Sequence, residues 1–344
     1  MSKDNSSGQH AGARAYPDRI WMATTAVAVL VALAALPFAV KYLRQSPPAA
    51  PVSFIAAIAA PEKATAIAGP VLSPDGRQLV FVAVVEGKSS LWLRPLGSLT
   101  AQQLPGTEGV NGIPFWSPDS RSIGFAAGGQ LRKLDLAGGA SQTLCQLPAN
   151  SGSEGTWNRD GVILFSGRVA IYRVPATGGE PAPTLRAKQP NLYRGPVFLP
   201  DGRHFLVLTT QPGAMELHLA ALDSQETTRL LATDSQASYA NGHLLFARAG
   251  ALLAAPFDAD SLKHTGEPFV IADKVRVSLW GNGFFSVSDN GSLVYDPNTL
   301  TDTRQLTWLD RTGKPLGTVG PVGEYESPSL SPDGKRVAVG RRDP

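Results

Sequence analysis

Short apolar runs, separated by polar bends rich in glycine and proline, dominate the chain after residue 51. One set of runs follows these bends directly and is apolar at consecutive positions, as expected for strands buried on both faces. A second set follows further along each unit and predicts a neighbouring strand. No segment after residue 44 shows a helical period. The first set is Leu79–Val82, Ile123–Phe125, Val162–Phe165, Phe205–Leu208, Leu244–Phe246 and Val337–Val339, and the second is Leu91–Leu93, Leu131–Leu136, Ile171–Val174, Leu217–Leu219, Leu252–Ala254 and Leu306–Leu309.

The bends themselves repeat, most clearly as Ser73-Pro74-Asp75-Gly76-Arg77. Proline presets φ at the first corner, aspartate bonds its own backbone, and glycine accepts a positive φ. The Asp or Asn of each copy falls at positions 75, 119, 160, 201, 241, 290 and 333, with spacings of 44, 41, 41, 40, 49 and 43 residues. The turn residues to which we assign this structural role are Asp75, Gly76, Asp119, Asp160, Gly161, Asp201, Gly202, Asn241, Gly242, Asn290, Gly291, Asp333 and Gly334.

A period of about 40–45 residues in an all-β chain is typical of a four-stranded propeller blade. We therefore expect an all-β fold over residues 52–344: a β-propeller of about six to seven four-stranded blades. The seventh copy supplies two strands, Ser327–Ser331 and Arg336–Gly340, so the last blade is expected to be incomplete. Either the missing strands are lost, or Val52–Ala56 returns to pair with the last blade. In both cases part of the edge at Arg336–Val339 would be free to recruit other chains.

A separate pattern lies near the amino terminus, where residues 21–40 carry no charge. Twenty helical residues span about 30 Å, the thickness of the hydrocarbon core of a bilayer. Trp21 and Tyr42 mark the two ends, where aromatic rings favour the headgroup region. A cleaved signal peptide is the alternative, but its apolar part would be shorter. The pattern predicts one transmembrane helix at 21–40, a disordered tail at 1–20 and a Pro/Ala-rich linker at 45–51.

The net charge of +3 arises entirely within residues 1–44, which hold five basic and two acidic side chains, and the remainder carries 26 of each sign. A nucleic-acid-binding domain needs a basic excess to neutralise phosphates, so no nucleic-acid partner is expected. Three basic residues precede the apolar stretch and two follow it. This bias favours a cytoplasmic amino terminus and places the large domain on the other side of the membrane.

The repeats resemble TolB-type propeller repeats, and most closely those in the extracytoplasmic region of bacterial receptor-like serine/threonine protein kinases. The resemblance covers roughly residues 51–344. It implies a single-pass protein of the bacterial inner (cytoplasmic) membrane, with its large domain outside the cytoplasm. A rigid ring with loops at both ends and a single anchor favours a protein or peptide partner in the cell envelope. Besides the Ser-Pro-Asp-Gly turns, the segments that carry it are Phe115–Arg121, Gly155–Gly161, Gln305–Arg311 and Gly313–Gly317.

The chain departs from those kinases because only twenty residues precede the predicted helix and no kinase motif is present. The Asn158-Arg159-Asp160 segment resembles a catalytic loop but belongs to the repeat. No nucleophile elbow, calcium loop or metal-ligand spacing of histidines occurs either. We therefore expect no catalytic residue, metal or cofactor, and a membrane-anchored binding, sensing or protein-interaction module. The alternatives are a split or truncated sensor part of a receptor-like kinase and, with less support, a propeller-based hydrolase or lyase.

Aromatic residues at the expected blade ends are candidates for a binding face. The lone cysteine, Cys145, lies in an apolar context that is typical of a small buried side chain. The aromatic candidates are Trp116, Trp157, Trp280 and Tyr325, whereas Trp92 and Trp308 are expected in the core between blades.

Overall fold

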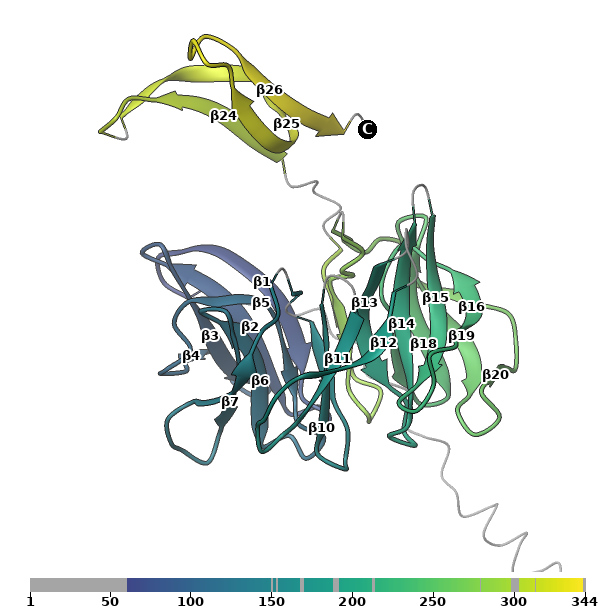
Figure 1. Ribbon diagram of the computed structural model, residues 1–344. Helices are drawn as coiled ribbons and strands as arrows, with labels where there is room; N and C mark the ends of the chain where they lie inside the picture. Colours follow the sequence, from purple (N-terminus) through teal and green to yellow (C-terminus); the bar gives the residue numbers. More distant parts are fainter. Residues whose placement is uncertain are drawn as a thin grey trace, which may run out of the picture. The chain divides into compact units, whose positions relative to one another are not determined.

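The computed structural model describes residues 61–342, except 150, 153, 168–169, 188–191, 212–213, 279, 298–302 and 313. These residues form strands, turns and bends, with no helix among them, and they confirm the predicted all-β propeller (Figure 1). No helix in this part of the chain could therefore cross a membrane. The predicted tail (1–20), transmembrane helix (21–40) and linker (45–51) lie outside the described residues.

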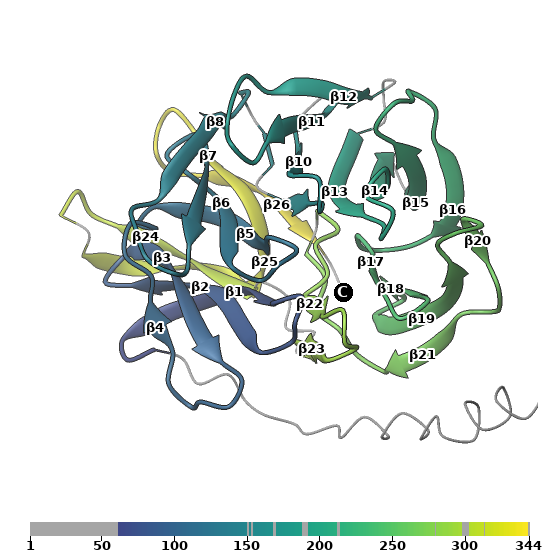
Figure 2. The same cartoon turned by 90° about the horizontal axis from the view of Figure 1, so that it is seen from below.

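Five antiparallel blades follow one another along the chain (Figure 2). In the fifth blade, β20 and β21 both pair with β19 and share the outermost position. The blades are β1 (Ala64–Leu72), β2 (Gln78–Val85), β3 (Lys88–Pro95) and β4 (Gln102–Gln103); β5 (Val110–Trp116), β6 (Ser122–Ala127), β7 (Gln130–Asp135) and β8 (Gln142–Gln146); β9 (Gly155–Trp157), β10 (Val162–Ser166), β11 (Ala170–Pro175) and β12 (Ala182–Arg186); β13 (Leu192–Phe198), β14 (His204–Gln211), β15 (Ala214–Ala221) and β16 (Thr228–Ala232); and β17 (Ser238–Ala240), β18 (His243–Arg248), β19 (Ala251–Asp258), β20 (Lys263–His264) and β21 (Phe269–Ala272).

The expectation of six to seven four-stranded blades is wrong, because the last two repeat copies do not build blades of that kind. The sixth copy connects β22 (Phe285–Val287) to β23 (Leu293–Tyr295), which pair only with each other. The segments after it form a separate three-stranded sheet of β24 (Thr303–Leu309), β25 (Pro315–Leu330) and β26 (Val337–Arg342). The physical reason is that β25 continues for 16 residues, through glycines and register shifts, and takes in most of Ser327–Ser331, which was expected to be a separate short strand.

The second strand of each blade is buried on both faces, as its apolar run predicts. Phe81, Phe125, Phe165 and Phe246 occupy similar places in four of these strands and are at most 1% exposed. The apolar clusters lie between neighbouring blades. For example, Val80 of the first blade packs with Ile123 of the second. Each blade therefore depends on the next one for its core.

The two-stranded sheet β22–β23 lies between the fifth blade and the first. Phe285 belongs to the apolar cluster of the fifth blade, and Val294 packs against that of the first. The backbone N–H of Leu72 donates to the Ser286 hydroxyl over 2.9 Å, which links β1 to β22. Part of the edge at Arg336–Val339 was expected to be free. Its β26 residues pair with β25, and β26 is the outer strand of the three-stranded sheet among the described residues. Val52–Ala56, the other candidate for closing the ring, lies outside the described residues.

Candidate functional site

In each of the five blades, a turn connects the innermost strand to the second strand. A similar turn connects β22 to β23. These turns therefore lie around the same mouth of the propeller. In the first turn, the Ser73 hydroxyl donates to Asp75 Oδ1 over 2.6 Å, and the Arg77 N–H donates to the same oxygen over 3.0 Å. Ser117 and Asp119 repeat this arrangement, as do Ser331 and Asp333 in the turn between β25 and β26. The aspartates thus act as local acceptors that hold the bend.

Two turns satisfy their backbone in a different way. In the third blade, Asn158 Oδ1 accepts the N–H groups of Asp160 and Val162, so the expected role of Asp160 passes to Asn158. In the fifth blade, Ala240 pairs directly with His243, and a two-residue hairpin with φ of 47° at Asn241 and 75° at Gly242 replaces the longer bend. Both central residues have the positive φ of a type I′ turn.

Neighbouring turns contact one another around the mouth. Asn290 of the sixth turn donates through Nδ2 to the Asp75 carbonyl over 3.1 Å, and the Asp289 N–H donates to the Pro74 carbonyl over 2.9 Å. A Cβ on Gly76 would lie 2.5 Å from Asn290 Nδ2, so glycine is required there for close approach as well as for its φ of 69°. These contacts fix the turn of β22–β23 against the turn of the first blade.

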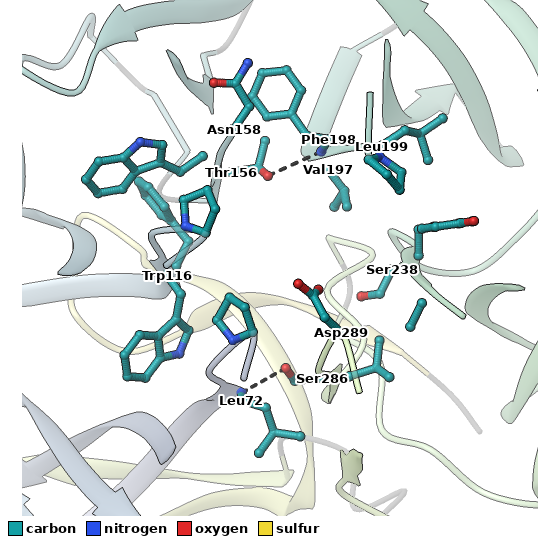
Figure 3. Close-up of a pocket in the computed structure, with 18 of the residues that line it drawn as sticks. Leu72, Trp116, Thr156, Asn158, Val197, Phe198, Leu199, Ser238, Ser286 and Asp289 are labelled. Carbon is teal, nitrogen blue, oxygen red and sulfur yellow. Dashed lines mark hydrogen bonds between the residues drawn. The ribbon is translucent and has the colours of Figure 1, made fainter. Parts of the chain in front are cut away.

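The innermost strands and these turns enclose a central cavity of about 460 Å³ (Figure 3). Its size lies within the usual range of ligand pockets, about 300–1,000 Å³. Apolar and aromatic side chains form much of the wall, and Thr156, Ser238 and Ser286 add hydroxyl groups. The lining residues used below are Pro74, Pro118, Arg159, Val197, Pro200, Ser238 and Asp289.

The cavity lining includes two charged residues, Arg159 and Asp289. Burial raises the pKa of the Asp289 carboxyl, and the positive charge of Arg159 opposes this rise more weakly. The carboxylates of the turns behave differently. The Ser117 hydroxyl, by donating to Asp119, holds the pKa of that aspartate below its usual value. The carboxylate at the cavity is therefore the one whose charge the fold disfavours.

The aromatic candidates prove to occupy different environments. Trp116 is only 6% exposed and donates through Nε1 to the Val71 carbonyl over 3.1 Å, and it lines the cavity (Figure 3). Tyr325 is also 6% exposed and does not line the cavity. Trp157 is partly buried and lines the cavity. Trp280 is 62% exposed, with the Arg194 guanidinium 4.9 Å from its ring centre. Cys145 is buried, and its pKa is raised by that burial.

Sequence reasoning missed Arg159 and Asp289 because the repeat turns were aligned on their common residues, and positions at which a single copy differs were not considered. The signal lay in their departure from the pattern, since Pro74, Pro118 and Pro200 occupy the same corner in other turns. Within the described residues, no group of three or more histidine, cysteine or acidic side chains is placed to hold a metal ion.

Comparison with known proteins places this architecture in a family. A family model of the TolB beta propeller domain matches residues 57–245, more than half of the chain. An uncharacterised protein of Agrobacterium fabrum, Atu1656, is 25% identical over 258 residues, which cover 67% of this chain and 84% of the relative. The crystal structure of TolB from Acinetobacter baumannii has a TM-score of 0.49 and 16% identity, covering 63% of this chain. The match spans only 56% of that TolB chain, little more than half its length.

A putative TolB from Agrobacterium tumefaciens is also similar, with 18% identity, a TM-score of 0.42 and coverage of 67% of this chain and 80% of its own. The family match and the propeller agree with the resemblance of the repeat turns to TolB-type repeats. The chain therefore belongs to the TolB β-propeller domain family.

Proposed function

We propose that this protein is a binding module whose propeller holds an extended segment of a partner protein at the mouth of the central cavity. The observation that carries the proposal is the open cavity of about 460 Å³, with apolar and aromatic walls and a few polar groups. Such walls supply contact area, and the polar groups supply orientation. The interlocked turns keep the mouth rigid, so little ordering cost opposes binding. The proposal assigns no reaction to this chain.

The test is to fill the cavity without disturbing the blades. Ser238 lies on the cavity wall at the start of β17, and Ser238→Trp would occupy space that a bound segment needs (Figure 3). Thr228→Trp is the control, because Thr228 is exposed on the outer strand β16. The full chain, with either substitution, is used to capture partners from cell-envelope extract. The proposal requires a protein that binds the wild type and Thr228→Trp but is lost with Ser238→Trp. Equal capture by all three would overturn it.

We also propose that the module is anchored in a bacterial inner membrane by residues 21–40, with the propeller outside the cytoplasm. The uncharged stretch and the distribution of flanking basic residues support this arrangement. A reporter that is active only outside the cytoplasm, fused after Pro344, should be active. Activity of a reporter that works only in the cytoplasm would contradict the orientation.

A sensing role is the second candidate, in which the module is the split or truncated sensor part of a receptor-like serine/threonine kinase. The repeat segments that resemble the extracytoplasmic region of such kinases favour it. A reading frame for a kinase domain that ends just upstream of this coding sequence would support the second candidate over a free-standing binding module. A neighbourhood without such a frame would favour the free-standing module.

A further inference from the structure

The corner of the repeat turn is occupied in two different ways around the cavity. Pro74, Pro118 and Pro200 hold this position in the first, second and fourth blades. Arg159 holds it in the third blade, and Asp289 holds it in the β22–β23 sheet. All five residues line the cavity. Proline suits the φ of this corner, so the formation of the turn does not require the charged side chains of Arg159 and Asp289.

Asp289 is held by its backbone, while its carboxylate has no partner. Its N–H donates to the Pro74 carbonyl over 2.9 Å, and the flanking Ser288 hydroxyl donates to Asn290 Oδ1 over 2.6 Å. The carboxylate points into the cavity (Figure 3) and forms no hydrogen bond or ion pair with the described residues. Asp289 is exposed at the mouth, and the partial burial of its carboxyl raises the pKa.

Arg159 is positioned in a similar way from another part of the ring. The preceding Asn158 is 4% exposed and anchors the turn, because its Nδ2 donates to the Gly202 carbonyl over 2.7 Å. The Arg159 side chain is exposed and forms no ion pair or hydrogen bond with the described residues. Its positive charge opposes part of the rise that burial causes in the pKa of the Asp289 carboxyl. The mouth thus presents one fixed anion and one cation that do not neutralise each other by contact.

We propose that the cavity mouth selects a peptide segment that carries a basic side chain for Asp289 and an acidic side chain for Arg159. This inference rests on the proposed function, since it names the chemistry of the segment bound at the same site. A lysine or arginine of the segment supplies the donors that the Asp289 carboxylate lacks. The guanidinium of Arg159 is suited to pair with a carboxylate through two parallel hydrogen bonds.

The two charges also give the bound segment a direction. A segment with its basic residue toward Asp289 and its acidic residue toward Arg159 pairs both groups. The same segment in the reverse direction places like charges together and is rejected. An uncharged segment of the same shape would leave the Asp289 carboxylate uncompensated.

A random peptide display library, selected against the immobilised full chain, tests this proposal. The variants are Asp289→Asn, Arg159→Gln and the exchange Asp289→Arg with Arg159→Asp. Asp260→Asn is the control, because Asp260 is exposed in the turn between β19 and β20, and its carboxylate has no partner among the described residues. Circular dichroism and melting curves check that each variant is folded. Neither Asp289 nor Arg159 uses its side chain to hold its turn, so all of them should fold.

The wild type and the control should enrich peptides with one basic and one acidic residue at a constant spacing. Asp289→Asn should lower the affinity for the selected peptide about tenfold or more, which is the loss expected when a charge-assisted hydrogen bond is removed. The exchanged variant should enrich the opposite order of charges. Peptides enriched without a charge pattern, or unaffected by Asp289→Asn, would overturn the charge proposal and leave the binding function standing. Failure of the wild type to enrich any peptide would overturn the proposed function, and this inference with it.

Discussion

Gly76→Ala should destabilise the propeller more than the same substitution at the equivalent glycine of another copy of the repeat. An alanine at the φ of 69° found at Gly76 costs about 1–2 kcal/mol through the contact of Cβ with its own backbone. Its Cβ would also lie 2.5 Å from Asn290 Nδ2, so the asparagine must move. Movement breaks the bond to the Asp75 carbonyl, which contributes about 0.5–1.5 kcal/mol. The total is about 1.5–3.5 kcal/mol.

Gly161→Ala is the matched control, because Gly161 has a φ of 76° but no atom within 4 Å of an added Cβ. It should lose only the conformational part, about 1–2 kcal/mol. Asn290→Ala combined with Gly76→Ala should remove the clash, so that the double variant is less destabilised than the sum of the two single ones. Urea unfolding of the full chain, followed by tryptophan fluorescence, measures all four free energies. Equal losses for Gly76→Ala and Gly161→Ala, or additive losses in the double variant, would refute the contact between these turns.

Two further predictions concern pH. Asp289→Asn should stabilise the protein at neutral pH, because the folded state raises the pKa of this carboxyl and so disfavours its charge; the gain should shrink as pH falls through the folded pKa and vanish below the ordinary aspartate value. Asp119→Asn should act in the opposite sense, because the pKa of Asp119 is lowered in the fold: its charge stabilises above the ordinary aspartate pKa and the effect is lost as pH falls through the folded value. Melting temperatures measured from about pH 3 to about pH 7, which covers the titration range of carboxyl groups and neutral pH, check both predictions. A variant whose melting temperature changes with pH in parallel with that of the wild type would contradict the corresponding assignment.

The strands could be predicted from the sequence because a blade repeats one local pattern. A turn with Ser73 and Asp75, followed by a run such as Leu79–Val82, identifies both the bend and the doubly buried strand. The number of blades could not be predicted in the same way. The turn at Asn290 has the same local chemistry, yet whether the sheet that contains it has two or four strands depends on pairing between distant segments. Local patterns do not determine such pairing.

The site was harder to predict because the repeat conceals it. Asn290 and Asn241 follow the periodicity, but the contact of Asn290 comes from the turn of another blade, and Asn241 lies in a different type of turn. Only the three-dimensional ring shows that Arg159 and Asp289, 130 positions apart in the chain, line one cavity. The close approach of Asn290 to Gly76 likewise joins residues that no local pattern connects.

The central claim, that the cavity is where a partner segment binds, is tested most directly by photo-cross-linking in the full chain. The photoreactive residue p-benzoylphenylalanine replaces Val197, which lines the cavity on β13, or Leu99, which is 85% exposed at the edge of the first blade. Illumination with a peptide selected from the display library should give a cross-link from position 197 and none from position 99. Asp289→Asn should reduce the yield at position 197. A cross-link from position 99 with none from position 197 would contradict the claim that the segment lies in the cavity.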